Sequence, residues 1–182
     1  NFCWPFTFIA HKGYHMKEAL KIAVLGGGSF GTTICNLIAE SGARPTLWLR
    51  SQERADEINQ QHKNSYYLAD FKLNPHVKAT TDIDQAVIDA HIVFVAVPSH
   101  SCRSVSQKIS NVISAQTMVV SVTKGIESAG FKLMSQVLKE ELPNNAIGVL
   151  SGPNLAVEIV QRQLTGTVIA SEDSQLIEAV QS

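Results

Sequence analysis

A glycine-rich turn near the start of the chain constrains the fold more than any other feature. It occupies residues 26–31, with the sequence GGGSFG, and directly follows the apolar run at residues 21–25. Apolar residues then recur on one face of a helix, at Phe30, Ile34, Leu37 and Ile38. The order of strand, glycine turn and helix predicts the opening of a βαβ unit, and with it an α/β fold.

Three glycines of this turn have separate predicted roles. Gly26 permits the sharp turn out of the strand, and Gly31 lets the helix pack closely on that strand. Gly28 leaves room for a pyrophosphate to approach the backbone, where the helix amides and the helix dipole attract an anion. The turn therefore predicts a dinucleotide site, and a glycine-rich loop without a ligand is the alternative.

Short apolar runs alternate with segments of helical periodicity along the rest of the chain. We expect strands at residues 20–25, 45–49, 91–97, 117–122, 146–150 and 166–170, and a weaker strand at 77–80. Most of these runs are continuously apolar, which is typical of strands covered by helices on both faces. This alternation predicts a doubly wound, mostly parallel α/β sheet of the Rossmann type.

Local signals place the ends of several helices. Gly42 suits the end of the first helix, and Asp82 can cap a helix at residues 83–89. A further helix is expected at residues 132–142, and the apolar spacing after residue 175 predicts one more at the end of the chain.

Charge and composition exclude several classes of function. The 182 residues carry 15 basic and 16 acidic side chains, a net charge of −1, without the basic stripe that nucleic-acid binding needs. No apolar run approaches the ~20 residues of a membrane span, and we recognise no metal-ligand spacing. The three cysteines are widely separated, which favours a reducing compartment such as the cytoplasm.

Residues 1–15 differ in character from the rest of the chain. They are rich in aromatic residues, and Pro5 interrupts them without the leading positive charge of a signal peptide. We therefore expect residues 1–15 to be an extension of unknown role and residues 16–182 to form a single dinucleotide-binding domain.

The end of the second predicted strand bears on the choice of cofactor. Dinucleotide-binding folds place an Asp or Glu there, ~20 residues beyond the glycines, to bind the ribose 2′-hydroxyl. This chain has Arg50 instead, and no carboxylate before Glu53. Arginine suits the 2′-phosphate, so we expect NAD or NADP with a tilt toward NADP. A solvent-facing arginine is the alternative.

Three further strand ends carry polar or small residues where ligands of a doubly wound sheet bind. They are Pro98 with Ser99, Lys124 between Thr123 and Gly125, and residues 151–154. Lys124 can direct its ammonium at a phosphate or carbonyl oxygen, although a surface lysine is the alternative. Residues 151–154 read as the start of a helix with free amides for an anion, or as a purely structural cap.

Four motifs in this order resemble those of the bacterial-type NAD(P)-dependent sn-glycerol-3-phosphate dehydrogenases. They are GxGSFG at residues 26–31, VPS at 97–99, TKG at 123–125 and SGPNLAxE at 151–158. The stretches at 67–68 and 79–82 also resemble that family, so the resemblance covers the chain from Lys21 to its end.

The resemblance implies a role for each matching position. It assigns pyrophosphate contacts to Ser29 and Phe30, and substrate contacts to Gly152 and Asn154. Lys124 would contact both cofactor and substrate. The remaining implied cofactor residues are Gly26, Gly28, Gly31, Arg50, Pro98 and Ala156. Asn154 departs from the Ser or Thr of bacterial members, but its amide can still form a hydrogen bond to substrate.

The resemblance also implies an activity, the interconversion of dihydroxyacetone phosphate and sn-glycerol 3-phosphate for glycerophospholipid synthesis. In that family a second, all-helical domain supplies the acid/base lysine. We expect that domain to be absent from this chain. A homodimer formed through that domain is possible. The alternatives are a related dehydrogenase that acts on a sugar acid or ketopantoate, and a non-catalytic NAD(P)-binding module.

Overall fold

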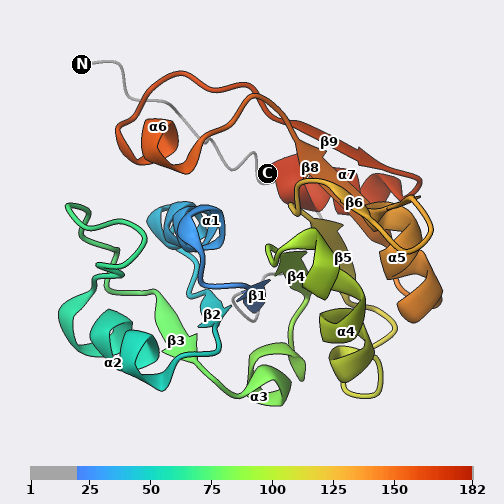
Figure 1. Ribbon diagram of the computed structural model, residues 1–182, viewed down its shortest axis with the longest axis horizontal. Helices are drawn as coiled ribbons and strands as arrows, with labels where there is room; N and C mark the ends of the chain where they lie inside the picture. Colours follow the sequence, from blue (N-terminus) through green and yellow to red (C-terminus); the bar gives the residue numbers. More distant parts are fainter. Residues whose placement is uncertain (1–19, 182) are drawn as a thin grey trace, which may run out of the picture.

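A computed structural model describes residues 20–181, and the extension expected at residues 1–15 lies outside that range. The strands are β1 (Ile22–Leu25), β2 (Thr46–Trp48), β3 (Lys78–Thr80), β4 (Ile92–Val95), β5 (Met118–Ser121), β6 (Ile126–Glu127), β7 (Lys132–Leu133), β8 (Ile147–Ser151) and β9 (Val168–Ser171). The helices are α1 (Ser29–Glu40), α2 (Gln52–Gln61), α3 (Ile83–Val87), α4 (Ser99–Ile109), α5 (Met134–Glu141), α6 (Ala156–Val160) and α7 (Ser174–Gln181). Figure 1 shows their arrangement.

Seven strands form one sheet in the order β3-β2-β1-β4-β5-β8-β9. All neighbouring pairs are parallel except β8 and β9, so the mostly parallel doubly wound fold predicted from the alternation is confirmed. The chain moves from β1 toward β2 on one side and later returns to β4 on the other. This reversal places a crevice beyond the carboxyl ends of β1 and β4, where such sheets bind ligands.

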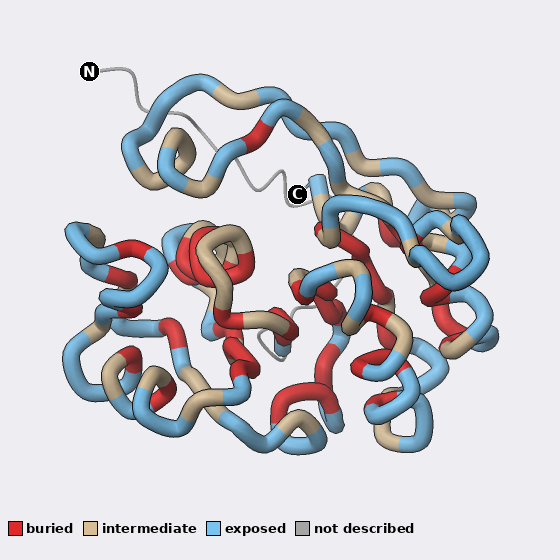
Figure 2. Tube along the Cα trace, viewed as in Figure 1, coloured by how far each residue is buried: buried red, intermediate tan, exposed pale blue. Residues whose placement is uncertain are grey.

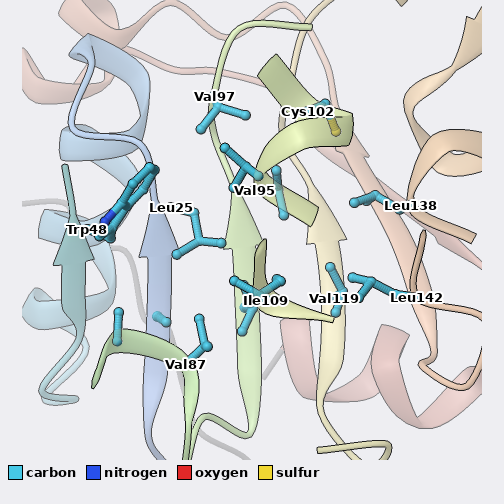
Figure 3. Close-up of a cluster of buried hydrophobic side chains, with 14 of the residues drawn as sticks. Leu25, Trp48, Val87, Val95, Val97, Cys102, Ile109, Val119, Leu138 and Leu142 are labelled. Carbon is cyan, nitrogen blue, oxygen red and sulfur yellow. The ribbon is translucent and has the colours of Figure 1, made fainter. Parts of the chain in front are cut away.

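Two apolar layers cover the sheet, one on each face. Along β1, Ala23 and Leu25 face the layer formed by α3, α4 and α5, whereas Val24 faces the layer formed by α1, α2 and α7. Figure 3 shows part of the first layer, with Leu25, Val95 and Val119 projecting from adjacent strands. Burial on both faces explains why the strand sequences are continuously apolar.

The predicted helix boundaries at Gly42 and Asp82 are confirmed, although the helix expected at 83–89 ends at Val87. Gly42 adopts a positive φ of 98° just after α1, and its amide donates to the Ala39 carbonyl at 3.1 Å. The Asp82 carboxylate accepts hydrogen bonds from the backbone amides of Asp84 and Gln85 at the start of α3. Each end is therefore fixed by local chemistry that the sequence displays.

Two predicted helix starts are wrong. The helix expected at 132–142 begins only at Met134, because β7 pairs with β6 in an antiparallel hairpin. Residues 151–154 do not begin a helix either. Ser151 is the last residue of β8 and pairs with Val168, and the Asn154 amide donates to the Gly152 carbonyl at 2.8 Å. That amide is thus engaged in a tight turn, and α6 begins two residues later.

The segment between β8 and β9, which we call the strap (residues 152–167), crosses back over α1. Its short helix α6 packs against α1, as Figure 1 shows. Figure 2 shows that the strap is mostly exposed, in contrast to the buried strands below it. The strap therefore covers the start of α1 from the side opposite the sheet and forms one wall of the site described next.

Candidate functional site

The glycine turn connects β1 and α1 at the crevice. Gly26 adopts φ +123°, a conformation that residues with a side chain rarely adopt, and its amide donates to the Trp48 carbonyl at 2.9 Å. A Cβ at Gly31 would overlap the Gly26 carbonyl oxygen, so only glycine allows α1 to pack this closely on the turn. These roles are the ones predicted for Gly26 and Gly31.

Gly28 differs from its neighbours because a Cβ there would meet no protein atom within 4 Å. It is the N-cap of α1, and no side chain caps the helix or adds an acidic group to its first turn. The first amides of α1 therefore remain available to an anion, which the helix dipole also favours. An open Cβ direction and uncapped amides together fit a pyrophosphate.

A buried asparagine braces the turn from the side of the loop after α2. The side-chain amide of Asn64 donates to the Gly27 carbonyl at 3.1 Å and to the Thr32 hydroxyl at 2.8 Å. Ser29 donates its hydroxyl to the Tyr67 carbonyl at 3.3 Å. The loop that carries Tyr67 is thereby tied to the glycine turn, which places an aromatic side chain beside it.

A cavity of about 470 Å³, which we call the turn cavity, opens along residues 26–31. Arg50 and Arg54 line it beyond β2, and Thr123 and Lys124 line it beyond β5. Since β2 and β5 lie on opposite sides of the β1–β4 pair, the cavity extends across the reversal point in both directions. An elongated dinucleotide needs a site of this shape.

A second cavity of about 530 Å³, the strap cavity, lies between the start of α1 and the strap. Ser29, Phe30 and Lys124 line both cavities, so the two adjoin there. The Lys124 ammonium donates to the Asn154 carbonyl at 2.9 Å and lies 5.5 Å from the centre of the Phe30 ring. Lys124 therefore stands where the two hollows meet.

The loop that presents Lys124 is held at both ends. The Thr123 hydroxyl lies within hydrogen-bonding distance of the Val97 carbonyl, at 2.9 Å, next to Pro98, the N-cap of α4. Beyond Gly125, which adopts φ +102°, the β6–β7 hairpin begins. The position of Lys124 thus depends on β4, α4 and the hairpin together.

Arg103 of α4 fastens this hairpin. Its guanidinium donates to both carboxylate oxygens of Glu127 at 2.7 and 2.9 Å, to Glu140 at 2.8 Å, and to Glu141. The Lys132 ammonium also reaches Glu140 at 2.6 Å. The hydrogen bonds from Arg103 lower the pKa of Glu127, and those from Lys132 and then Arg103 lower the pKa of Glu140. Both carboxylates are therefore held in their charged form.

The structure brings most of the predicted site residues together. The turn cavity is lined by Gly26, Gly28, Ser29, Phe30, Gly31, Arg50, Pro98 and Lys124. Asn154 and Ala156 line the strap cavity, although the Asn154 side-chain amide lies 3.4 Å from the Thr167 hydroxyl. Gly152 lines neither cavity, since the Gly166 carbonyl occupies its Cβ direction where the two arms of the strap cross.

Three features of the site escaped the sequence reasoning. Arg54 lines the turn cavity, Asn64 braces the glycine turn, and Arg103 fastens the hairpin. The sequence does contain a signal for the hairpin, because the turn-forming residues Ser128, Ala129 and Gly130 separate the segments that become β6 and β7. The partners of Arg54, Asn64 and Arg103 lie too far along the chain for a local pattern to indicate them.

Residues 20–181 offer neither a cluster of metal ligands nor a membrane-spanning helix. No group of three or more His, Cys, Asp or Glu side chains there could hold a metal ion. None of the helices in this range has the length and apolar character to cross a membrane.

Comparison with known proteins identifies the family of this chain. A family model described as the N-terminus of NAD-dependent glycerol-3-phosphate dehydrogenase matches residues 21–177. The chain belongs to this family. The match spans β1 to α7, and so includes the glycine turn, the Lys124 loop and the strap.

Individual relatives agree with the family model. The chain is 55% identical over 161 residues to a glycerol-3-phosphate dehydrogenase (NAD(P)+) of Acinetobacter baylyi, covering 88% of this chain and 44% of the relative. For one of Teredinibacter turnerae the values are 48% over 166 residues, 91% and 49%. A solved glycerol-3-phosphate dehydrogenase from Coxiella burnetii superposes with a TM-score of 0.84 at 28% identity, covering 89% of this chain and 50% of that one. The chain thus spans about half the length of the relatives it matches.

Proposed function

We propose that the protein containing this chain interconverts dihydroxyacetone phosphate and sn-glycerol 3-phosphate, with NAD or NADP as the cofactor that this chain binds. One observation carries the proposal. In a chain of this family, an uncapped glycine turn at the sheet reversal opens into a cavity that ends at Lys124. The names of the relatives support the choice of substrate and cofactor.

The chain's own residues bind and orient the cofactor in this proposal. The first amides of α1 would hold the pyrophosphate, for which the open Cβ direction of Gly28 leaves room. Arg50 beyond β2 would hold the adenosine half of the cofactor, and Lys124 beyond β5 would lie on the side of the nicotinamide half. When bound, the cofactor would supply the hydride-transfer chemistry at its nicotinamide ring.

Lys124 is suited to orient the substrate. An ammonium group has three donors, and here one of them is directed at the Asn154 carbonyl. The other two can donate to substrate oxygens in the strap cavity, which Lys124 and Asn154 both line. A fixed cation next to negatively charged oxygens stabilises charge there without moving during the reaction.

The cellular setting is part of the same proposal. Both cysteines of the described residues, Cys35 and Cys102, are buried free thiols, and burial raises the pKa of each. Unreactive free thiols are consistent with a reducing compartment, so we place the enzyme in the cytoplasm. A homodimer formed through a second domain stays a prediction.

The test uses the variant Gly28→Val. Calorimetric titration of the wild-type chain with NADPH and NADH should give saturable binding. We expect Gly28→Val to abolish it, because the new side chain projects into the space left for the pyrophosphate. The matched control is Gly166→Val, since a Cβ there also meets no atom within 4 Å but lies outside both cavities. Unchanged affinity in Gly28→Val would place the cofactor elsewhere.

A further inference from the structure

A second arginine accompanies Arg50 at the adenosine end of the turn cavity. Arg54 lies four residues after Arg50, in the first turn of α2, and lines the same cavity. Its guanidinium carbon lies 5.1 Å from the centre of the Tyr66 ring and 5.3 Å from that of Tyr67. The two rings meet edge to face, with centres 4.8 Å apart. Arg54 is therefore held in place by aromatic contacts.

No carboxylate of the described residues forms an ion pair with Arg54. Within residues 20–181, neither Arg50 nor Arg54 forms an ion pair. α2 has three acidic residues: Asp56 accepts a hydrogen bond from Gln52, Glu57 accepts from the Ser65 amide, and Glu53, next to Arg54 in the chain, forms no ion pair within residues 20–181. The first turn of a helix also disfavours a cation, because the helix dipole is positive there. The helix dipole thus gives no reason for a cation at this position.

We infer that Arg54 is a specificity-determining residue, which with Arg50 binds the 2′-phosphate of NADP and makes this chain prefer NADP(H) to NAD(H). The inference rests on the proposed function, because it concerns the same cofactor site. A guanidinium can lie against aromatic rings and still direct its N–H edge at a phosphate. The tyrosine contacts restrict the side chain beforehand, so less conformational entropy is lost when the phosphate binds.

The experiment compares ligands with and without the 2′-phosphate. The chain and its Arg54→Gln variant are titrated with NADPH, NADH, adenosine 2′,5′-bisphosphate and AMP. We expect Arg54→Gln to weaken the affinity for NADPH and for the bisphosphate about tenfold, because one charge-assisted contact is lost. The affinities for NADH and AMP, which lack the 2′-phosphate, should change less than about twofold. Raising the salt concentration should narrow the wild-type preference for NADPH, since part of the cavity is open to solvent.

Two further variants sharpen the test. Arg44→Gln removes an exposed arginine that lines neither cavity, and it should leave all four affinities unchanged. Tyr66→Leu keeps the charge of Arg54 but removes one of its rings, so it should weaken NADPH by a smaller factor than Arg54→Gln. Thermal unfolding of each variant verifies that the fold is retained.

The outcomes separate this inference from the function on which it rests. Equal weakening of NADPH and NADH by Arg54→Gln would mean that Arg54 contacts the adenosine and does not select the 2′-phosphate. No weakening of either would remove it from the site. Both results overturn the inference and leave the proposed cofactor binding intact. If the wild-type chain binds neither dinucleotide, the proposed function fails and the inference fails with it.

Discussion

Gly28 and Gly31 lie three residues apart in one turn, yet a side chain at each would meet opposite surroundings. At Gly28 a Cβ points into open space, whereas at Gly31 it would overlap the Gly26 carbonyl oxygen. The first glycine is needed for a ligand and the second for the fold. One glycine motif therefore combines a requirement for binding, at Gly28, with a requirement for packing, at Gly31. Measurements of affinity and of stability can separate the two.

We predict that Gly31→Ala lowers the free energy of unfolding by about 3 kcal/mol, because the backbone of the turn must move to admit the methyl group. The loss should exceed the advantage of about 1 kcal/mol that alanine has over glycine within a helix. Gly28→Val should lower the free energy of unfolding by only about 1 kcal/mol, because its Cβ would meet no protein atom within 4 Å and the remaining cost is the poor N-cap preference of valine. Urea unfolding of both variants measures the difference. Equal stability of Gly31→Ala and the wild type would contradict the packing role.

At the scale of the elements, the β6–β7 hairpin is fixed to α4 and α5 through charges. Arg103 of α4 contacts Glu127 of β6 and Glu140 and Glu141 of α5. The hairpin has only two residues in each strand, so its own ladder contributes little. The position of the neighbouring Lys124 loop therefore depends on this cluster.

The pKa values of Glu127 and Glu140 predict how stability depends on pH. Both are lowered in the folded protein, so the cluster stabilises the fold above the ordinary carboxyl pKa of 4.5, and this contribution is lost as pH falls through the lowered values. Arg103→Gln should therefore reduce stability at pH 7, and its stability should fall less than that of the wild type between pH 7 and acid pH. Urea unfolding across this range provides the measurement.

The Lys21–Asp89 pair is the control for this prediction. Its side chains are 58% and 67% exposed, and solvent screens a pair of that kind. Lys21→Gln should leave the pH dependence of unfolding close to that of the wild type. If Arg103→Gln behaves in the same way, the cluster does not fasten the hairpin.

At the scale of the whole molecule, the chain presents the turn cavity beside the more open strap cavity. The turn cavity is lined by residues of β2, α1, α2 and α4 and of the loops after β1, β2, α2, β4 and β5, which a single folded sheet brings together. The strap above α1 is largely exposed and includes apolar side chains such as Leu155, Val157 and Leu164. The turn cavity is therefore walled by many elements of the sheet and its helices, whereas the strap cavity is bounded on one side by the exposed strap alone.

We predict that this chain binds NADPH but oxidises it with dihydroxyacetone phosphate only negligibly. The resemblance places the acid/base lysine in a second domain, and a positioned proton donor contributes typically ~10²–10⁴-fold to the rate. In a protein of the relatives' full length that contains this segment, Lys124→Ala should depress turnover strongly but leave the melting temperature nearly unchanged, because Lys124 is exposed. Absorbance of NADPH follows both reactions. Robust turnover by this chain alone would show that its own residues supply the proton.

The sequence by itself determined the features that depend on near neighbours along the chain. Continuous apolar runs predicted the strands of the large sheet, and the glycine spacing predicted the turn at Gly26, Gly28 and Gly31, all confirmed in the fold. Asp82 and Gly42 marked helix ends correctly because capping involves residues two to four positions apart. The same local information placed Arg50 at the end of β2 and Lys124 at the end of β5.

Only the tertiary structure decided which distant groups meet. Residues 151–154 have the composition of a helix start, but pairing of Ser151 with Val168 extends β8 through that position. Lys124 reaches the Asn154 carbonyl only because the strap folds back over α1. Arg54 likewise finds its tyrosines only because Asn64 anchors the loop that carries them. Such contacts are selected by the free energy of the whole packed chain, and no local pattern contains that information.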